Sequence, residues 1–162
     1  METLLQCSDI SEKIMSNRIN KQQTVRSVYD ASLIKFPKIL DPRGNLTFIE
    51  QEQHIPFKIA RVYWIYDVPG GEQRGGHAFR DQEECIIALS GSFDVFLDDG
   101  TAQKIVHLNR AYHGLYVPKM LWRRMQNFST NAVAYVLASC PYKAEDYVRD
   151  YDTYKSLMRE GK

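Results

Sequence analysis

Short runs of alternating apolar and polar residues dominate the chain from residue 33 onward. The runs are rich in β-branched and aromatic residues, and Gly, Pro, Asp and Ser separate them about every 8–12 residues, which is typical of strands. The pattern predicts an all-β sandwich, barrel or jelly roll. The expected strands cover 33–38, 45–50, 58–68, 85–90, 93–97, 102–108, 115–117, 121–128 and 133–139.

Two of the connections carry strong turn signals. Ser90-Gly91-Ser92 is too short for anything but a tight link, and Asp98-Asp99-Gly100 is typical of a β-hairpin. A third turn is expected at Asp41-Pro42-Arg43-Gly44, where proline presets its backbone angle and glycine tolerates a positive one. The strands on either side of each turn are therefore expected to be neighbours.

The C-terminal stretch changes period. Its apolar residues recur at steps of three and four, which is the spacing of one face of a helix. An amphipathic helix is therefore expected over 144–159, with its apolar stripe against the core or a second subunit. The stripe consists of Tyr147, Tyr151, Tyr154 and Met158.

The first 30 residues differ from the rest. They are polar with scattered apolar positions, and Ser8 suits the N-cap of a short helix over 9–17. We expect an N-terminal appendage over 1–30, followed by one folded domain over 31–162.

Composition excludes several classes of partner. With 21 basic and 20 acidic residues the net charge is +1, which gives no electrostatic reason to bind nucleic acid or a membrane surface. No run approaches the roughly 18 apolar residues of a membrane span, and the first residues lack a signal-peptide pattern. The three cysteines are far apart, which favours free thiols in a reducing cytoplasm.

One stretch carries the spacing of a metal-binding motif. Gly71, His77, Glu84 and Gly91 stand where the first motif of the cupin barrels has its Gly, first His, Glu and Gly. Phe79 stands where that motif has a second His. A cupin-type jelly-roll barrel with a C-terminal amphipathic helix is therefore the expected fold.

The second cupin motif is altered as well. Pro118, Met120, Arg123 and Asn127 match its spacing, but arginine replaces its metal-ligating histidine. A divalent metal generally needs three or four protein ligands, and a guanidinium beside the site would repel it. We expect no metal and no other cofactor.

Further motifs, in order along the chain, resemble those of the nucleotide-sugar 3,4-ketoisomerases, the cupin family that acts on dTDP-4-keto-6-deoxyglucose. The resemblance runs from about residue 33 to 155. It rests on Asp41-Pro-Arg-Gly44, Arg61-Val-Tyr63-Trp-Ile-Tyr66, Arg74-Gly-Gly-His77, Leu97-Asp-Asp-Gly100, Gly114-Leu-Tyr116-Val-Pro118 and Asp146-Tyr-Val-Arg-Asp-Tyr151.

The resemblance implies a specific reaction. Members move a ketone from C4 to C3 of a 6-deoxyhexose carried on dTDP, a step toward 3-amino-3,6-dideoxy sugars of surface glycans. They are homodimers, often with swapped N-terminal strands, and they use neither metal nor nicotinamide. This chain departs from their usual Arg-Gly-x-His-Ala-His-Lys, because Phe79 and Arg80 replace the last His and Lys.

The chemistry assigns roles to a few side chains. A base must take the C3 proton, and His77 suits that role because the pKa of a free imidazole is about 6.5. Residues two apart on a strand share a face, so Phe79 is expected as an apolar wall that lowers the pKa of His77. Tyr63 is the first candidate for a second proton carrier, and Tyr116 and Glu84 are weaker ones.

The remaining candidates would bind the substrate. Arg43 or Arg74 could hold the enediolate oxygen or the pyrophosphate, because a guanidinium offers two parallel donors. Arg123 and Arg124 are alternatives. Trp122 is considered both for stacking on thymine and for the core.

Three other functions stay open. A related isomerase or epimerase could act on another nucleotide sugar. A non-catalytic sugar-nucleotide-binding cupin would also fit the loss of a proton carrier, and a metal-dependent cupin oxygenase is the most remote alternative.

Overall fold

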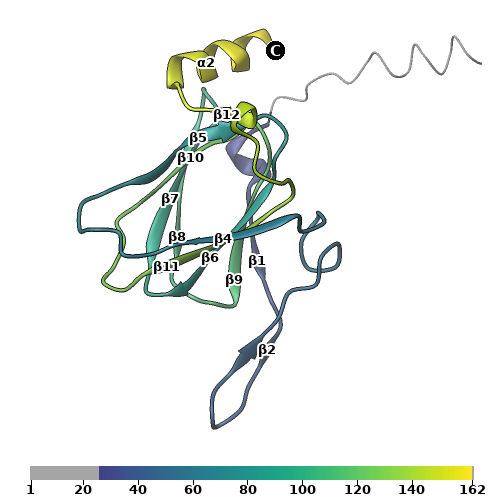
Figure 1. Ribbon diagram of the computed structural model, residues 1–162, viewed down its shortest axis with the longest axis vertical. Helices are drawn as coiled ribbons and strands as arrows, with labels where there is room; N and C mark the ends of the chain where they lie inside the picture. Colours follow the sequence, from purple (N-terminus) through teal and green to yellow (C-terminus); the bar gives the residue numbers. More distant parts are fainter. Residues whose placement is uncertain (1–25, 162) are drawn as a thin grey trace, which may run out of the picture.

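A computed structural model of the protein describes residues 26–161, which form two antiparallel five-stranded sheets packed face to face (Figure 1). The expectation of an all-β cupin-type jelly roll is confirmed. The first sheet contains β1 (Ser32–Lys35), β9 (His113–Val117), β6 (Glu84–Ser90), β11 (Val133–Ala138) and β4 (Arg61–Ile65), in that order. The second contains β12 (Tyr147–Val148), β5 (Arg74–Phe79), β10 (Trp122–Gln126), β7 (Phe93–Asp98) and β8 (Gln103–Leu108).

The core lies between the two sheets. Side chains alternate along each strand, so every second residue faces inward and is removed from water. Ile86 and Val136 of the first sheet meet Val95, Leu97 and Met125 of the second, each no more than 2% exposed. The alternation read from the sequence therefore identifies the inward face of these strands.

Both tight connections occur as expected. Ser90-Gly91-Ser92 joins β6 to β7, and Gly91 has φ +63°. A Cβ at Gly91 would lie 2.5 Å from Ser129 Oγ, so only glycine fits there. Asp98-Asp99-Gly100 starts the connection between β7 and β8, which pair from Phe93 to Asp98.

Asp99 ties the first described residues to this hairpin. Its carboxylate accepts hydrogen bonds from the backbone N–H of Val28 (3.0 Å), Thr101 (2.9 Å) and Ala102 (2.7 Å) and from the Ser27 hydroxyl (3.2 Å). Val28 opens the 3-10 helix η1 (Val28–Asp30) and is completely buried in the core. Packed structure thus begins before residue 31.

We expect Asp99→Asn to lower the free energy of unfolding by about 1–3 kcal/mol at pH 7, because the amide keeps only one of the two acceptor oxygens and carries no charge, so some of these donors lose their acceptor. Burial alone raises the pKa of Asp99, but the hydrogen bonds from Thr101, Ala102 and Val28 outweigh it and hold the pKa well below its usual range. The stabilisation is therefore present above about pH 4 and lost as the pH falls further. Urea denaturation should show that the difference in the free energy of unfolding between wild type and Asp99→Asn becomes smaller toward pH 3. The matched control Asp152→Asn, at an exposed side chain, should change the free energy of unfolding very little. A loss equal to that of Asp99→Asn would contradict the prediction.

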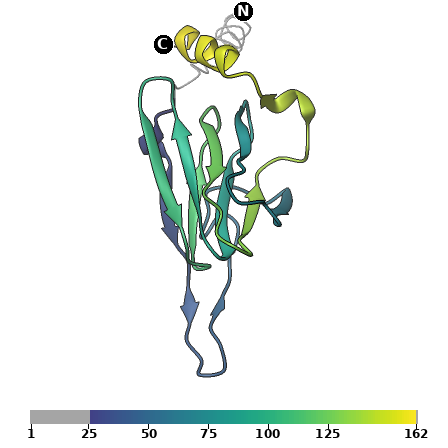
Figure 2. The same ribbon diagram turned by 90° about the vertical axis from the view of Figure 1, so that its left-hand side faces the viewer.

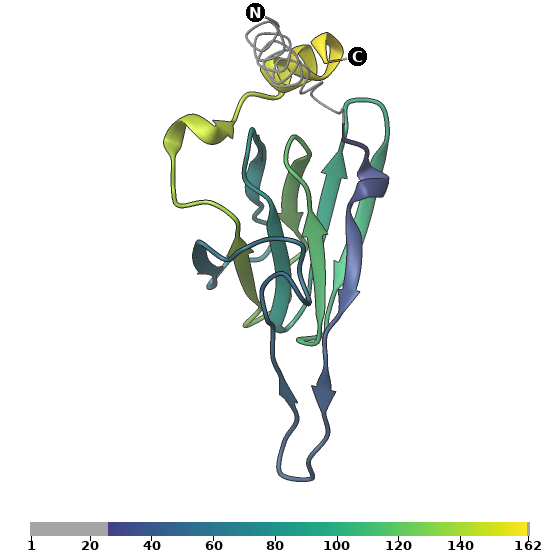
Figure 3. The same ribbon diagram turned by 90° about the vertical axis from the view of Figure 1, so that its right-hand side faces the viewer.

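A hairpin of β2 (Lys38–Ile39) and β3 (Leu46–Thr47) extends away from the two sheets (Figures 2 and 3). The chain that follows it folds back onto the outer face of the first sheet. There Ile55 and Phe57, together with Phe36 from just before the hairpin, cover Cys85 and Ile87, whose side chains point away from the main core. Part of that outer face is thereby buried, and the rest stays open.

The C-terminal region corrects one expectation. The helix α2 covers Tyr151–Glu160 and does not start at 144. Its N-cap is Asp150, whose side chain accepts a hydrogen bond from the Thr153 N–H (2.7 Å). The preceding residues form a 3-10 turn, η2 (Ala144–Asp146), and the short strand β12, which pairs with β5.

Helix α2 packs on the end of the second sheet. Tyr154 and Met158 are buried against Trp122, and the Tyr154 hydroxyl donates to the carbonyl of Asp98 (2.7 Å). Among residues 26–161 no helix is long and apolar enough to cross a membrane. The helix expected over 9–17 lies outside the described residues.

Candidate active site

A pocket of about 540 Å³ opens where β4, β5 and β10 meet the segment that leads into α2. It brings together four residues singled out from the sequence, namely Tyr63, Arg74, His77 and Arg123. β5 is the central element, because it lies between β10 and β12 and carries His77 in register with Arg123.

Irregular pairing shapes this part of β5. Arg123 pairs with His77 and Met125 with Arg74, so the register shifts by one residue between them. Gly75 takes up the shift at φ +76°, and a Cβ there would meet Met125 Cε at 3.4 Å and His77 Cε1 at 3.7 Å. Such bulges re-aim side chains next to active sites, and here the bulge turns β5 at the histidine.

His77 is a neutral imidazole in the wall of the pocket. Its ring lies 4.8 Å from the ring centroids of both Phe79 and Tyr147. Burial, followed by the positive charges of Arg123 and Arg149, lowers the pKa of His77 to about 2. Its Nε2 atom is buried and finds no hydrogen-bond partner among the described residues. The imidazole is therefore unprotonated at working pH.

Behind the pocket lies a buried network centred on Glu84. Its Oε1 accepts hydrogen bonds from the Tyr63 hydroxyl and from Gln82 Nε2, both at 2.7 Å, and its Oε2 accepts from Arg123 Nε at 2.8 Å. Glu84 and Arg123 are each 1% exposed. Burial and the Glu84 charge raise the pKa of Tyr63 well above its usual value. Tyr63 therefore stays protonated, with its hydroxyl hydrogen engaged by Glu84.

This network also bears on the altered metal motif. Glu84, which holds a metal-ligand position in the cupin motif, is paired with the arginine that replaces a ligand of the second motif. Within residues 26–161, no three His, Cys, Asp or Glu side chains come together as a metal site would require. The residues present do not suit a divalent cation, because Arg123 already neutralises Glu84.

Phe79 was expected to form an apolar wall of the pocket, but it is buried behind the residues that line the pocket. It is 3% exposed and does not line the pocket. Its ring packs under the Arg123 guanidinium (4.4 Å) and against Tyr147 (4.5 Å). Phe79 thus supports the pocket from behind, and its contact with His77 contributes to the burial that lowers the pKa of that imidazole.

Besides Glu84 and Phe79, three further candidates do not line this pocket. Arg43 is at the turn of the β2–β3 hairpin, with its side chain 90% exposed and paired with Asp41. Tyr116 packs on the outer face of the first sheet and donates to Glu83. Trp122 packs against Tyr151 and Tyr154 of the C-terminal region.

The sequence argument missed residues of the C-terminal segment and of β4. Tyr142, Tyr147 and Arg149 line the pocket, together with Arg61 of β4. Tyr147 and Arg149 were missed because the 3.6-residue period was extended back to 144, which placed both on a helix. The usable signal was the block Asp146-Tyr-Val-Arg-Asp-Tyr151 of the family resemblance, which holds two of these residues.

Known proteins match over most of the chain. The family model described as "FdtA: WxcM-like, C-terminal" matches residues 29–159. The TDP-4-oxo-6-deoxy-alpha-D-glucose-3,4-oxoisomerase of Aneurinibacillus thermoaerophilus is 45% identical over 126 residues, which are 78% of this chain and 91% of that protein.

Solved structures give the same result. QdtA, a sugar 3,4-ketoisomerase from Thermoanaerobacterium thermosaccharolyticum in complex with TDP, superposes with a TM-score of 0.80 at 39% identity, covering 83% of this chain and 98% of that one. The TDP-quinovose 3,4-ketoisomerase WlaRB from Campylobacter jejuni reaches 0.76 at 40% identity, covering 80% and 99%.

Fold, pocket and relatives together define a cupin-type isomerase. The chain belongs to the FdtA-like family of sugar 3,4-ketoisomerases. The resemblance read from its motifs is thereby confirmed.

Proposed function

We propose that the protein moves the ketone of a dTDP-linked 4-keto-6-deoxyhexose from C4 to C3. The observation that carries this proposal is His77, a neutral imidazole in the wall of a pocket rich in arginine. The C4 ketone acidifies the C3 proton, and an unprotonated imidazole beside it can act as the general base. The relatives named for this reaction supply the substrate class.

The charge of the pocket supports a diphosphate ligand. Arg61, Arg74 and Arg149 line it, and among the described residues none of the three forms an ion pair with a carboxylate. Arginine binds phosphate oxygens through two parallel N–H donors. We assign these three side chains to the diphosphate and the developing enediolate. Arg123 is excluded from that role because Glu84 already neutralises it.

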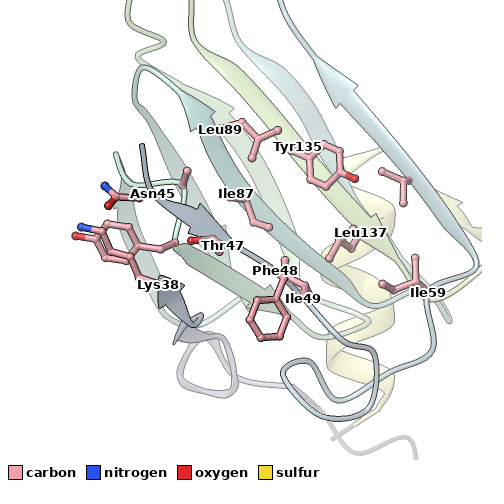
Figure 4. A pocket seen from close by; sticks show the side chains of 13 residues that line it. Lys38, Asn45, Thr47, Phe48, Ile49, Ile59, Ile87, Leu89, Tyr135 and Leu137 are labelled. Carbon is pink, nitrogen blue, oxygen red and sulfur yellow. The ribbon is translucent and has the colours of Figure 1, made fainter. Parts of the chain in front are cut away.

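We further propose that the protein is a homodimer that uses the outer face of the first sheet. A groove of about 740 Å³ lies there, and Figure 4 shows Phe48, Ile59, Leu89 and Tyr135 among the side chains that line it. The nearby hairpin exposes Leu40 at 72%. An apolar groove beside a protruding apolar hairpin is the kind of surface that a second copy covers.

The dimer can be tested by one charge placed in the groove. We expect Leu89→Asp to weaken self-association at least about tenfold, because the carboxylate would be buried without a partner. Ile105→Asp is the matched control, since Ile105 is 59% exposed on β8 of the other sheet. Sedimentation equilibrium measures both. A wild-type protein that stays monomeric at tens of micromolar would overturn the proposal.

The compartment follows from the thiols and the substrate class. Cys85 and Cys140 are free in the described part of the chain, and unpaired thiols persist in reducing compartments. We therefore propose that the reaction takes place in the cytoplasm.

The reaction itself is tested with dTDP-4-keto-6-deoxyglucose in D₂O, followed by proton NMR. We expect a 3-keto product that carries deuterium at C4. Saturable binding without a new product and without loss of the C3 proton signal would leave a sugar-nucleotide-binding protein and would refute the isomerase. Exchange at C3 followed by inversion at that carbon, with the ketone still at C4, would indicate an epimerase.

A further inference from the structure

Tyr147 lies beside the histidine, a position that the expected helix over 144–159 did not give it. It pairs directly with Phe79 across β12 and β5, and directly opposed residues of antiparallel strands project on the same face. His77 is two residues before Phe79 and shares that face. The Tyr147 ring therefore contacts both, at 4.5 Å from Phe79 and 4.8 Å from His77.

Tyr147 also separates Phe79 from the substrate side. Tyr147 lines the pocket, whereas Phe79 beneath it does not. A functional group carried by Tyr147 therefore lies nearer to a bound ligand than one at position 79. In this chain, the phenol of Tyr147, from the C-terminal segment, forms the side of the pocket next to His77.

Of the tyrosines beside His77, Tyr147 has the available hydroxyl. The Tyr63 hydroxyl donates to Glu84. The Tyr147 hydroxyl has no hydrogen-bond partner among residues 26–161, and the Arg149 guanidinium lies 4.1 Å from the centroid of its ring. Tyr142 is more distant, 61% exposed and 5.7 Å from the Tyr147 ring.

We propose that Tyr147 is the second proton carrier of the reaction and delivers a proton to C4. This inference rests on the proposed function, and it supplies the group that Phe79 cannot provide. Tyr63 then acts as a positioning residue, because its hydroxyl holds Glu84 and through it Arg123.

His77 takes the C3 proton, the C–H electron pair becomes the C3=C4 bond, and the C4 carbonyl electrons move to O4. The O4 oxygen takes a proton from solvent and the O3 hydroxyl loses one to solvent, so that the C3=O bond forms. The C3=C4 electrons then take the Tyr147 proton at C4. Water in the open pocket reprotonates the phenolate and accepts the proton from His77, which returns both groups to their starting states.

A mechanism with two proton carriers and one with His77 alone deliver different hydrogen isotopes to C4. If His77 alone moved the proton, hydrogen from C3 would reappear at C4 in part of the product. With Tyr147 as donor, hydrogen at C4 comes from solvent. Removal of the phenol should then block migration while leaving the first step, exchange at C3, intact.

The experiment compares wild type, Tyr147→Phe and Tyr29→Phe with dTDP-4-keto-6-deoxyglucose in D₂O. Tyr29 is the matched control, because it is 78% exposed on η1 and outside the pocket. For Tyr147→Phe we expect C3 exchange within about threefold of wild type and ketone migration at least about 100-fold slower. Tyr147→His, which restores a proton donor, should recover part of the lost migration. Melting temperatures should agree within a few degrees, since phenylalanine keeps the ring contacts.

The outcomes separate the two proposals. Undiminished migration in Tyr147→Phe, or a parallel fall of exchange and migration that Tyr147→His does not reverse, overturns the role of Tyr147 and leaves the proposed function standing. A wild-type protein that neither exchanges C3 nor migrates the ketone refutes the proposed function, and the role of Tyr147 with it.

Discussion

Replacing His77 with asparagine should slow both C3 exchange and ketone migration by roughly 10²–10⁴-fold, the contribution of one well-placed general base. Asparagine is close to histidine in size and keeps the polarity, but it cannot accept a proton. Both steps should fail together because every later step depends on the enediolate that His77 forms. This result differs from that expected for Tyr147→Phe, in which exchange continues.

His107→Asn is the matched control for this substitution. His107 lies on β8 with its side chain 54% exposed, paired with Asp94 away from the pocket. The rates of C3 exchange and ketone migration of His107→Asn should stay within about twofold of wild type. If His77→Asn exchanged C3 within fivefold of the wild-type rate, another base would be at work and the assignment would be wrong.

The same histidine makes a prediction about pH. Since the pKa of His77 is lowered to about 2, the imidazole is already the free base, and kcat/KM should show no acid limb near pH 6.5. The unfolded chain, in contrast, takes up a proton near pH 6.5. Stability should therefore fall as the pH drops below that value, by at most about 1.4 kcal/mol per pH unit. Denaturation of His77→Asn between pH 7.5 and 5 should lack this component.

Replacing Arg123 with methionine should lower the free energy of unfolding by about 3–5 kcal/mol, because Glu84 would keep a buried charge without its partner. Both side chains are 1% exposed. The change also removes the cation packed over Phe79 and the donor to the His77 carbonyl oxygen at 3.2 Å. Urea denaturation at pH 7.5 measures the loss.

Arg124→Met is the matched control for Arg123→Met, because it makes the same change one residue further along β10. The Arg124 guanidinium lies 4.9 Å from the Phe96 ring centroid and is only partly buried, so the cost should stay below about 1 kcal/mol. The double variant Glu84→Met with Arg123→Met should be more stable than Arg123→Met alone, since no unpaired charge remains. A loss under about 1.5 kcal/mol for Arg123→Met would mean that the pair is not desolvated in solution.

The sequence alone located most of the strands along the chain and the two tight connections, and it made His77 the candidate base. Strand alternation and turn chemistry are local properties, so Asp98-Asp99-Gly100 and the apolar periodicity could be read without knowledge of the fold. The spacing that contains His77, Glu84 and Arg123 identified the cupin motifs, and the motif series identified the family.

Only the tertiary structure decided how these residues are used. The two-residue strand β12 gains its stability from pairing with β5, far away in sequence, so a local period could not separate it from helix α2. That pairing carries Tyr147 over Phe79 and Arg149 into the pocket. Arg43 carries an equally good phosphate-binding group, yet the hairpin holds it away from His77. Long-range contacts set burial and neighbouring charge, and these turn a motif histidine into a neutral base.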